Sequence, residues 1–206
     1  MVPLEELIAR DYFERNGFFL KRIHLPPQPE GRKTKNPIPT PPTYLLQRET
    51  GRTKNEELAD RFQLFSSDVS GLALATLTLI PWHGSGLDMP IFQSPTRYRS
   101  WIRNTIAPAL QYTQQELQKI PVPATPLPMA LLPGIPAQDP QRRESIELLR
   151  GAGIAAAFTV RTLLESLIHQ VEAKPDAPET AITEILRTLK AYGLISPPQL
   201  DLFQDL

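Results

Sequence analysis

The stretch from Phe65 to Gly86, FSSDVSGLALATLTLIPWHGSG, decides the fold. Its middle, Leu72 to Ile80, is a nearly continuous apolar run between a glycine and a proline. Such runs are typical of strands that are buried on both faces of a sheet. We therefore predict that this run is the central strand. Trp82 and His83 follow at once in a glycine-flanked turn, where side chains can reach a cleft.

The bulk composition is typical of a soluble globular protein. The chain has 206 residues, of which 41% are hydrophobic, and a formal net charge of zero, which suits one domain with a hydrophobic core. The absence of cysteine excludes disulfides, thiolate zinc sites and a cysteine nucleophile. There is no basic region followed by an apolar one at the start, and no apolar stretch approaches the roughly 20 residues that cross a bilayer. We expect a cytoplasmic protein with no membrane contact.

Helices and strands are predicted on both sides of the central strand from the period of their apolar residues. The predicted helices cover residues 3–15, 96–119 with a kink or a split at Pro108, 141–150, 160–171 and about 178–193, and the other strands cover 18–24, 44–48, 129–132 and 154–159. Strand, helix and strand in succession imply parallel pairing. Seven prolines between Pro26 and Pro42 exclude regular structure there.

These patterns favour an α/β (α+β) fold, with a mixed sheet flanked by helices and a helical C-terminal extension. We divide the chain into a core, residues 1–159, and C-terminal helices with a tail, residues 160–206, packed on that core. The core carries the proline-rich insertion at about residues 25–43. A polar connector, Thr50 to Asp60, precedes the central stretch.

Basic residues cluster in two places. Between Lys21 and Lys54 there are eight lysines or arginines and only two acids. Three arginines gather near the start of the helix that follows the central strand, where they oppose the helix dipole unless an anionic partner lies nearby. Both clusters are candidates for contact with DNA phosphates, and solvated surface charge is the alternative. The candidate nucleic-acid-binding residues are Arg97, Arg99, Arg103, Arg32, Lys33 and Lys35.

Few residues are arranged as a known catalytic or metal site. The histidines, His24, His83 and His169, have no other ligand at a zinc spacing. A metal site that cleaves phosphodiesters needs carboxylates that converge on a hard cation, and the central strand supplies none. Asp68 is the nearest acid; we expect it to be a turn or capping residue, with a metal ligand as the alternative.

Four segments, taken in order, resemble an uncharacterised family with the restriction-endonuclease-like, PD-(D/E)xK fold. They are LEELIARDYFERNGFFL, FQLFSSDVSGLALATLTLIPWHG, QRRESIELLRGAGIAAAFTVRTLLESLIHQVE and ILRTLKAYGLISPPQLDLF. The resemblance implies that the central strand ends in a valine-glutamate-valine-lysine, glycine, tryptophan, histidine motif. It also implies that the glutamate and lysine are active-site residues and that an aspartate on the preceding hairpin completes the metal site.

The chain keeps the end of that motif and lacks its chemistry. Trp82 and His83 match, but Thr78 stands at the glutamate position and Ile80 at the lysine position. The segment Pro42 to Leu46, where the aspartate is expected, contains no acid. Threonine and isoleucine cannot hold a divalent cation or position an attacking water, so we expect the catalytic chemistry to be absent.

A migrated site is the alternative. The acids available to it are Glu5, Glu6, Glu14 and Asp68, and His83 is a further residual candidate. Such a site would need Mg²⁺; without it, no cofactor is expected.

The C-terminal pentapeptide QLDLF, Gln199 to Phe203, resembles the motif by which bacterial DNA polymerases and repair proteins dock onto the sliding clamp. In that role Leu202 and Phe203 would enter an apolar pocket and Gln199 would be a polar anchor. The alternative is that the apolar residues pack back onto the domain. The candidate partner-binding residues are Gln199, Leu200, Asp201, Leu202 and Phe203.

The leading functional hypothesis is a pseudonuclease: a PD-(D/E)xK-like protein with a degenerate site, which acts by binding nucleic acid or a protein partner in DNA processing or defence. One alternative is an active metal-dependent nuclease with a migrated site. Another is a structural or scaffold subunit with no nucleic-acid contact.

Overall fold

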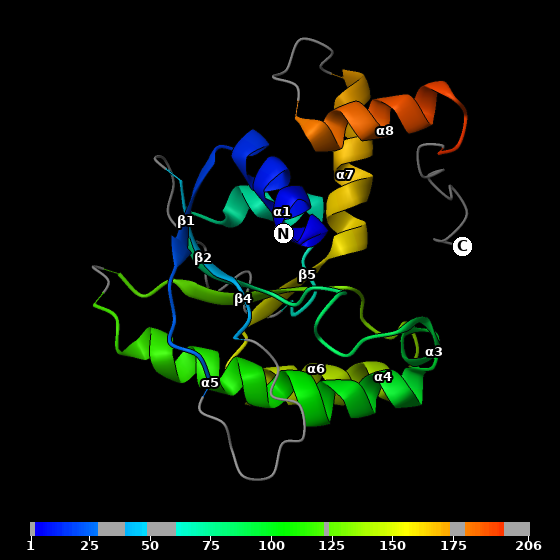
Figure 1. Cartoon of the computed structure of the whole chain (residues 1–206). Helices are drawn as coiled ribbons and strands as arrows, with labels where there is room; N and C mark the ends of the chain where they lie inside the picture. Colours follow the sequence, from blue (N-terminus) through cyan, green and yellow to red (C-terminus); the bar gives the residue numbers. More distant parts are fainter. Residues whose placement is uncertain (1–2, 29–39, 49–60, 122–123, 174–179, 196–206) are drawn as a thin grey trace.

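The computed structural model describes residues 3–28, 40–48, 61–121, 124–173 and 180–195. At its centre is a five-stranded sheet in the order β1-β2-β3-β4-β5 (Figure 1). The strands are β1 (Phe18–Ile23), β2 (Thr43–Arg48), β3 (Leu74–Leu79), β4 (Leu127–Leu132) and β5 (Ala156–Thr159). The pairs β1/β2 and β2/β3 are antiparallel, and β3/β4 and β4/β5 are parallel. The prediction of a mixed sheet flanked by helices is confirmed.

The predicted central strand is β3, which lies third among the five strands and is buried along almost its whole length. Alternate residues project into one hydrophobic cluster: Ala75, Leu77 and Leu79. Ile80, directly after the strand, lies in a second hydrophobic cluster, on the other side of the sheet. Because neighbouring side chains on a strand point to opposite faces, Thr76 and Thr78 lie on the same face as Ile80.

One face of the sheet is covered by α1 (Leu4–Arg15) and α7 (Val160–Ala173), with α8 (Ala181–Ala191) packed against both (Figure 1). We call it the α1/α7 face. Its core is aromatic: Phe158 of β5 lies 5.7 Å from Phe13 and 6.1 Å from Tyr12 between ring centroids. The helices α7 and α8 add apolar side chains to the same cluster.

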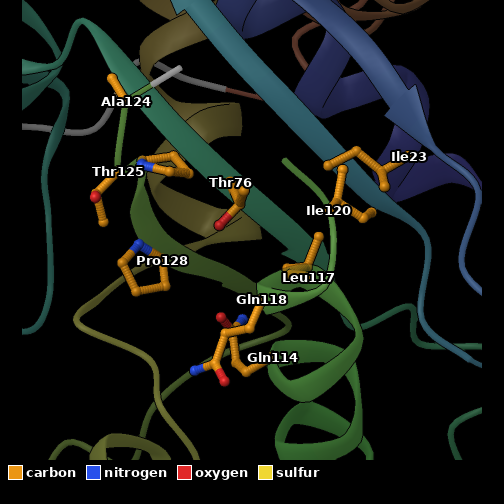
Figure 2. Close-up of a pocket in the computed structure, with 10 residues that line it drawn as sticks. Ile23, Thr76, Gln114, Leu117, Gln118, Ile120, Ala124, Thr125 and Pro128 are labelled. Atoms are coloured by element: carbon orange, nitrogen blue, oxygen red, sulfur yellow. The ribbon is translucent and has the colours of Figure 1, made fainter. Parts of the chain in front are cut away.

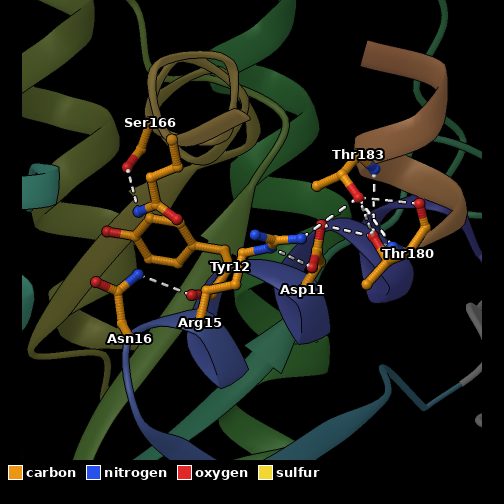
Figure 3. A network of polar contacts seen from close by, with 8 residues as sticks. Asp11, Tyr12, Arg15, Asn16, Ser166, Thr180 and Thr183 are labelled. Carbon is orange, nitrogen blue, oxygen red and sulfur yellow. Dashed lines mark hydrogen bonds and ion pairs between the residues drawn. The ribbon is translucent and has the colours of Figure 1, made fainter. Parts of the chain in front are cut away.

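A polar network fixes α1 to the start of α8 (Figure 3). The buried carboxylate of Asp11 accepts hydrogen bonds from Nε of Arg15 at 2.8 Å and from Oγ1 of Thr180 at 2.9 Å. Thr180 is also the residue that caps α8, because its hydroxyl accepts from the backbone N–H of Thr183. The first and last helices that the structure describes are therefore joined by one buried acid.

The opposite face, which we call the α5/α6 face, is covered by helices from the middle of the chain (Figure 1). These are α3 (Met89–Phe92), α4 (Pro95–Trp101), the π-helical segment η2 (Ile102–Ile106), α5 (Ala107–Gln118) and α6 (Gln141–Gly151). Their buried residues, with Ile80, form the second hydrophobic cluster.

The helix predicted over residues 96–119 is present, but its distortion precedes Pro108 and is not confined to that residue. The π-helical segment η2 separates α4 from α5, and Pro108 lies in the first turn of α5. A proline lacks the backbone N–H, and its ring crowds the carbonyl group four residues earlier. For Pro108 that residue is Asn104, within η2, so widening the turn there relieves the conflict.

Several predictions concern residues outside the described ranges. These residues include most of the proline-rich insertion, the connector Thr50 to Asp60 and the QLDLF tail. The candidate binding residues outside the described ranges are Arg32, Lys33, Lys35, Gln199, Leu200, Asp201, Leu202 and Phe203. Within the described ranges, no helix has the length and apolar character needed to cross a membrane.

Candidate functional site

A pocket of about 320 Å³ opens at the carboxyl end of β3, and we call it the exit pocket. Its apolar walls include Pro42, Ile80 and Ile106. Its polar groups include Arg22 from β1 and His83 from the turn after β3. Both of these side chains are exposed, so the pocket is apolar inside and carries basic or titratable groups at its mouth.

The conformation of two glycines and two side-chain hydrogen bonds hold the turn after β3 in place. Gly84 and Gly86 have φ of 85° and 72°, the left-handed region that favours glycine. The indole Nε1 of Trp101 donates to the backbone oxygen of Ser85 at 2.8 Å. On the other side, Glu5 Oε1 accepts from the backbone N–H of Trp82 at 2.8 Å. The position of the turn is therefore set by both helical layers.

His83 and Trp82 have different environments. His83 is exposed and lines the exit pocket, as the sequence predicts for a side chain in this turn. Trp82 is only partly exposed, and its ring lies 4.9 Å from that of Phe92 between centroids. The prediction that exit side chains reach a cleft is therefore confirmed for His83, whereas Trp82 packs on α3.

Thr78, at the position where the family resemblance implies a glutamate, faces Thr43, which lies in the segment Pro42 to Leu46 where the resemblance implies an aspartate. Thr78 of β3 is directly opposite Thr43 of β2 in the strand register, and their Oγ1 atoms are 3.3 Å apart. The hydroxyl of Thr43 also donates to the backbone oxygen of Pro41 at 3.1 Å. Both side chains are buried, and Ile80 is buried in the apolar cluster. Two hydroxyls that bond to each other and an aliphatic side chain do not fit a divalent cation, which prefers carboxylate and carbonyl oxygens.

Asp68 and His83 are not brought together. Asp68 precedes β3 and His83 follows it, so the two residues lie beyond opposite ends of a six-residue strand that spans about 20 Å at 3.3 Å per residue. Asp68 Oδ2 accepts from the backbone N–H of Phe65 at 2.8 Å, and Oδ1 lies 3.5 Å from Arg61. The predicted capping role of Asp68 is confirmed.

The other acids named for a migrated site have separate partners. Glu5 holds the turn after β3. Glu14 is exposed and pairs with Arg10 at 3.2 Å. Glu6 is buried beside Tyr44, where burial first and the Glu6 carboxylate second raise the pKa of Tyr44 to about 12. In the part of the chain that the structure describes, no three His, Cys, Asp or Glu side chains form a group that could hold a metal ion.

The three arginines after the central strand also differ. Arg99 pairs with Glu144 of α6, which is the anionic partner that its place near a helix start requires. Arg97 and Arg103 are exposed and form no ion pair with any described residue. Arg103 belongs to η2 and is not among the residues that line the exit pocket. Arg22 and His83 are the basic side chains that line that pocket.

A second pocket, of about 350 Å³, lies between β3 and the end of α5, and we call it the α5 pocket (Figure 2). It is lined by residues that include Thr76 of β3, Gln114 and Gln118 of α5, Ile23 of β1 and Pro128 of β4. The sequence analysis singled out none of these residues. Two glutamines four positions apart are common on helices, so no local signal distinguishes them.

A scan against protein-family models, and searches of the curated proteins and of the solved structures, found no match to this chain. Its function is therefore inferred from the geometry and chemistry of its own residues.

Proposed function

We propose that this chain is a pseudonuclease: a restriction-endonuclease-like, PD-(D/E)xK frame that binds DNA and lacks the metal chemistry of cleavage. The observation that carries the proposal is the Thr43–Thr78 pair. The resemblance requires an acid on the preceding hairpin next to an acid on the central strand, and β2 places Thr43 directly opposite Thr78. The frame for two converging side chains is present, and both side chains are uncharged.

Two exposed arginines, Arg22 at the exit pocket and Arg103 in η2, support binding to DNA. Arg22 and Arg103 are exposed and form no ion pair with a described residue, so their charges are available to phosphate oxygens. Arg99 is a weaker candidate for this role because it already pairs with Glu144. Contacts of this kind are independent of sequence and weaken as salt rises, since counterions are released when phosphates are neutralised.

The test is a salt-dependent titration of labelled DNA with the full chain, followed by anisotropy. The double variant R22A/R103A should weaken binding at least tenfold at low salt, and it should reduce the slope of log affinity against log salt by about two. The matched control is R61A/R161A, which removes two exposed arginines that pair with Asp68 and Glu165 and do not line the exit pocket. No binding at low salt, or equal weakening by both double variants, would leave a scaffold subunit as the better interpretation.

Cleavage is tested separately, by incubating the protein with DNA and Mg²⁺ or Mn²⁺. We expect intact DNA. Metal-dependent cleavage that disappears in D68A would instead support an active nuclease with a migrated site.

For the tail, we propose docking to a bacterial sliding clamp through QLDLF. Deleting residues 199–206 should abolish retention of the protein by an immobilised clamp, with DNA binding unchanged. Unchanged retention would remove the docking proposal.

A further inference from the structure

The α5 pocket is polar without being charged. Its lining residues include two amides and a threonine hydroxyl, and none carries a formal charge. Ile23, Leu117 and Pro128 supply apolar walls beside these groups. Burying an ion in such surroundings is costly because no opposite charge compensates for the lost hydration. The pocket therefore favours a neutral ligand that has apolar surface and hydrogen-bonding groups.

Gln114 has an unused donor at this place. Its Nε2 is buried and has no hydrogen-bond partner among the residues that the structure describes. The side chain lies close against Gly153, since a Cβ there would be 3.2 Å from Gln114 Cγ. A buried amide N–H without an acceptor is destabilising, so a turn of the Gln114 side chain that lets a ligand in the pocket accept from Nε2 would remove that cost.

The polar groups are placed so that one flat ligand could reach them together. Gln114 and Gln118 are four positions apart and project from the same side of α5. Figure 2 shows them across the pocket from Thr76, with Ile23 and Pro128 on the flanks. A glutamine amide offers a donor and an acceptor side by side, the pattern that matches the edge of a nucleobase.

We propose that the α5 pocket binds a single unpaired nucleobase. Its volume of about 350 Å³ lies in the usual range for small-molecule pockets. The base edge would bond to Gln114 and Gln118, and its ring would lie between the apolar walls, as in other proteins that accept an unstacked base. The choice of a nucleobase among neutral heterocycles rests on the proposed DNA-binding function.

The pocket lies next to the degenerate site. Thr76 precedes Thr78 by two residues on the same face of β3, which separates them by about 7 Å. A base in the α5 pocket would therefore lie close to the position at which a catalytic version of this frame would act on the DNA strand.

The test uses the full chain and free nucleosides, so it does not depend on binding to the DNA backbone. Adenosine, guanosine, cytidine and thymidine are each titrated by calorimetry or by NMR. At least one should bind saturably, and Q114L should weaken that nucleoside about tenfold, the effect of one lost hydrogen bond together with its unpaired partner. T76V is a second variant that removes a hydroxyl from the opposite wall and should also weaken binding.

The matched control is Q115L, the same substitution at an exposed position of the same helix. It should leave nucleoside affinity unchanged. The inference is overturned if no nucleoside binds saturably, if Q115L weakens binding as much as Q114L, or if neither Q114L nor T76V weakens it. R22A/R103A should bind nucleosides normally, which separates failure of this inference from failure of the DNA-binding proposal.

Discussion

The two faces of the sheet are filled differently. On the α1/α7 face, aromatic and aliphatic side chains form a continuous cluster, and the buried acid Asp11 has two hydrogen-bond partners. On the α5/α6 face, the α5 pocket lies beside the second cluster, while the exit pocket opens at the end of β3 between residues of both faces. The Thr43–Thr78 pair lies between residues that line the two pockets. From this difference we expect the first face to contribute most of the stability, and we assign the proposed binding to the two pockets.

The largest expected effect is on the α1/α7 face. Replacing Phe158 by alanine should lower the free energy of unfolding by about 3–5 kcal/mol, because it leaves a cavity beside Tyr12 and Phe13. Urea denaturation measures the change. F19A is the control, since Phe19 is 63% exposed and should cost less than about 1 kcal/mol. Equal losses in the two variants would contradict the assignment of this face as the main core.

The Asp11 network should give the next largest effect. D11A should cost about 2–3 kcal/mol, since it removes the buried acid that pairs with the partly buried guanidinium of Arg15 and accepts from the hydroxyl of Thr180. E14A breaks an exposed pair with Arg10 on the same helix and should cost less than about 0.5 kcal/mol. Both values come from urea denaturation, and a similar cost for the two variants would show that the network adds nothing.

On the α5/α6 face, the threonine pair should give a smaller effect. T43V should cost about 1–2 kcal/mol, because the buried Thr78 hydroxyl loses its partner. The double variant T43V/T78V should cost less than the sum of the two single variants, since it removes both hydroxyls. Additive losses would show that the two hydroxyls do not interact.

The smallest effect at neutral pH is expected for Y44F, which should change stability by less than about 1 kcal/mol at pH 7. The folded state holds the phenolic proton of Tyr44 more tightly than the unfolded chain, because burial and the neighbouring Glu6 raise its pKa from 10.0 to about 12. The stability that Tyr44 contributes in its protonated form is fully present below pH 10 and is lost as the pH rises toward 12. Between pH 8 and pH 11, the urea midpoint of Y44F should therefore fall less than the midpoint of the unchanged protein. An equal fall in the two proteins would contradict the raised pKa of Tyr44.

Most elements of the fold could be predicted from local patterns. The apolar run of β3, the period of α7 and the opening helix each identify a strand or a helix directly, because side chains repeat every two or every 3.6 residues. The capping role of Asp68 also follows from its place after two serines. In the candidate site, the sequence indicated His83 at the exit of the central strand.

The rest of the site depends on contacts between distant segments. Glu5 reaches the backbone of Trp82 across 77 positions of the chain, and no local pattern predicts that contact. The α5 pocket is equally inaccessible to sequence analysis, since Thr76 and Gln114 become neighbours only when α5 packs on the sheet. The same holds for Arg99, whose partner Glu144 is on another helix.

By itself, the sequence determined the order and type of the elements and the absence of acids at Thr78 and Ile80, because both are properties of neighbouring residues. Only the tertiary structure decided that Thr43 lies against Thr78, that Asp68 and His83 lie beyond opposite ends of β3, and which residues line the two pockets. The physical reason is that strand register and helix packing are set by the combined burial of segments far apart in the chain.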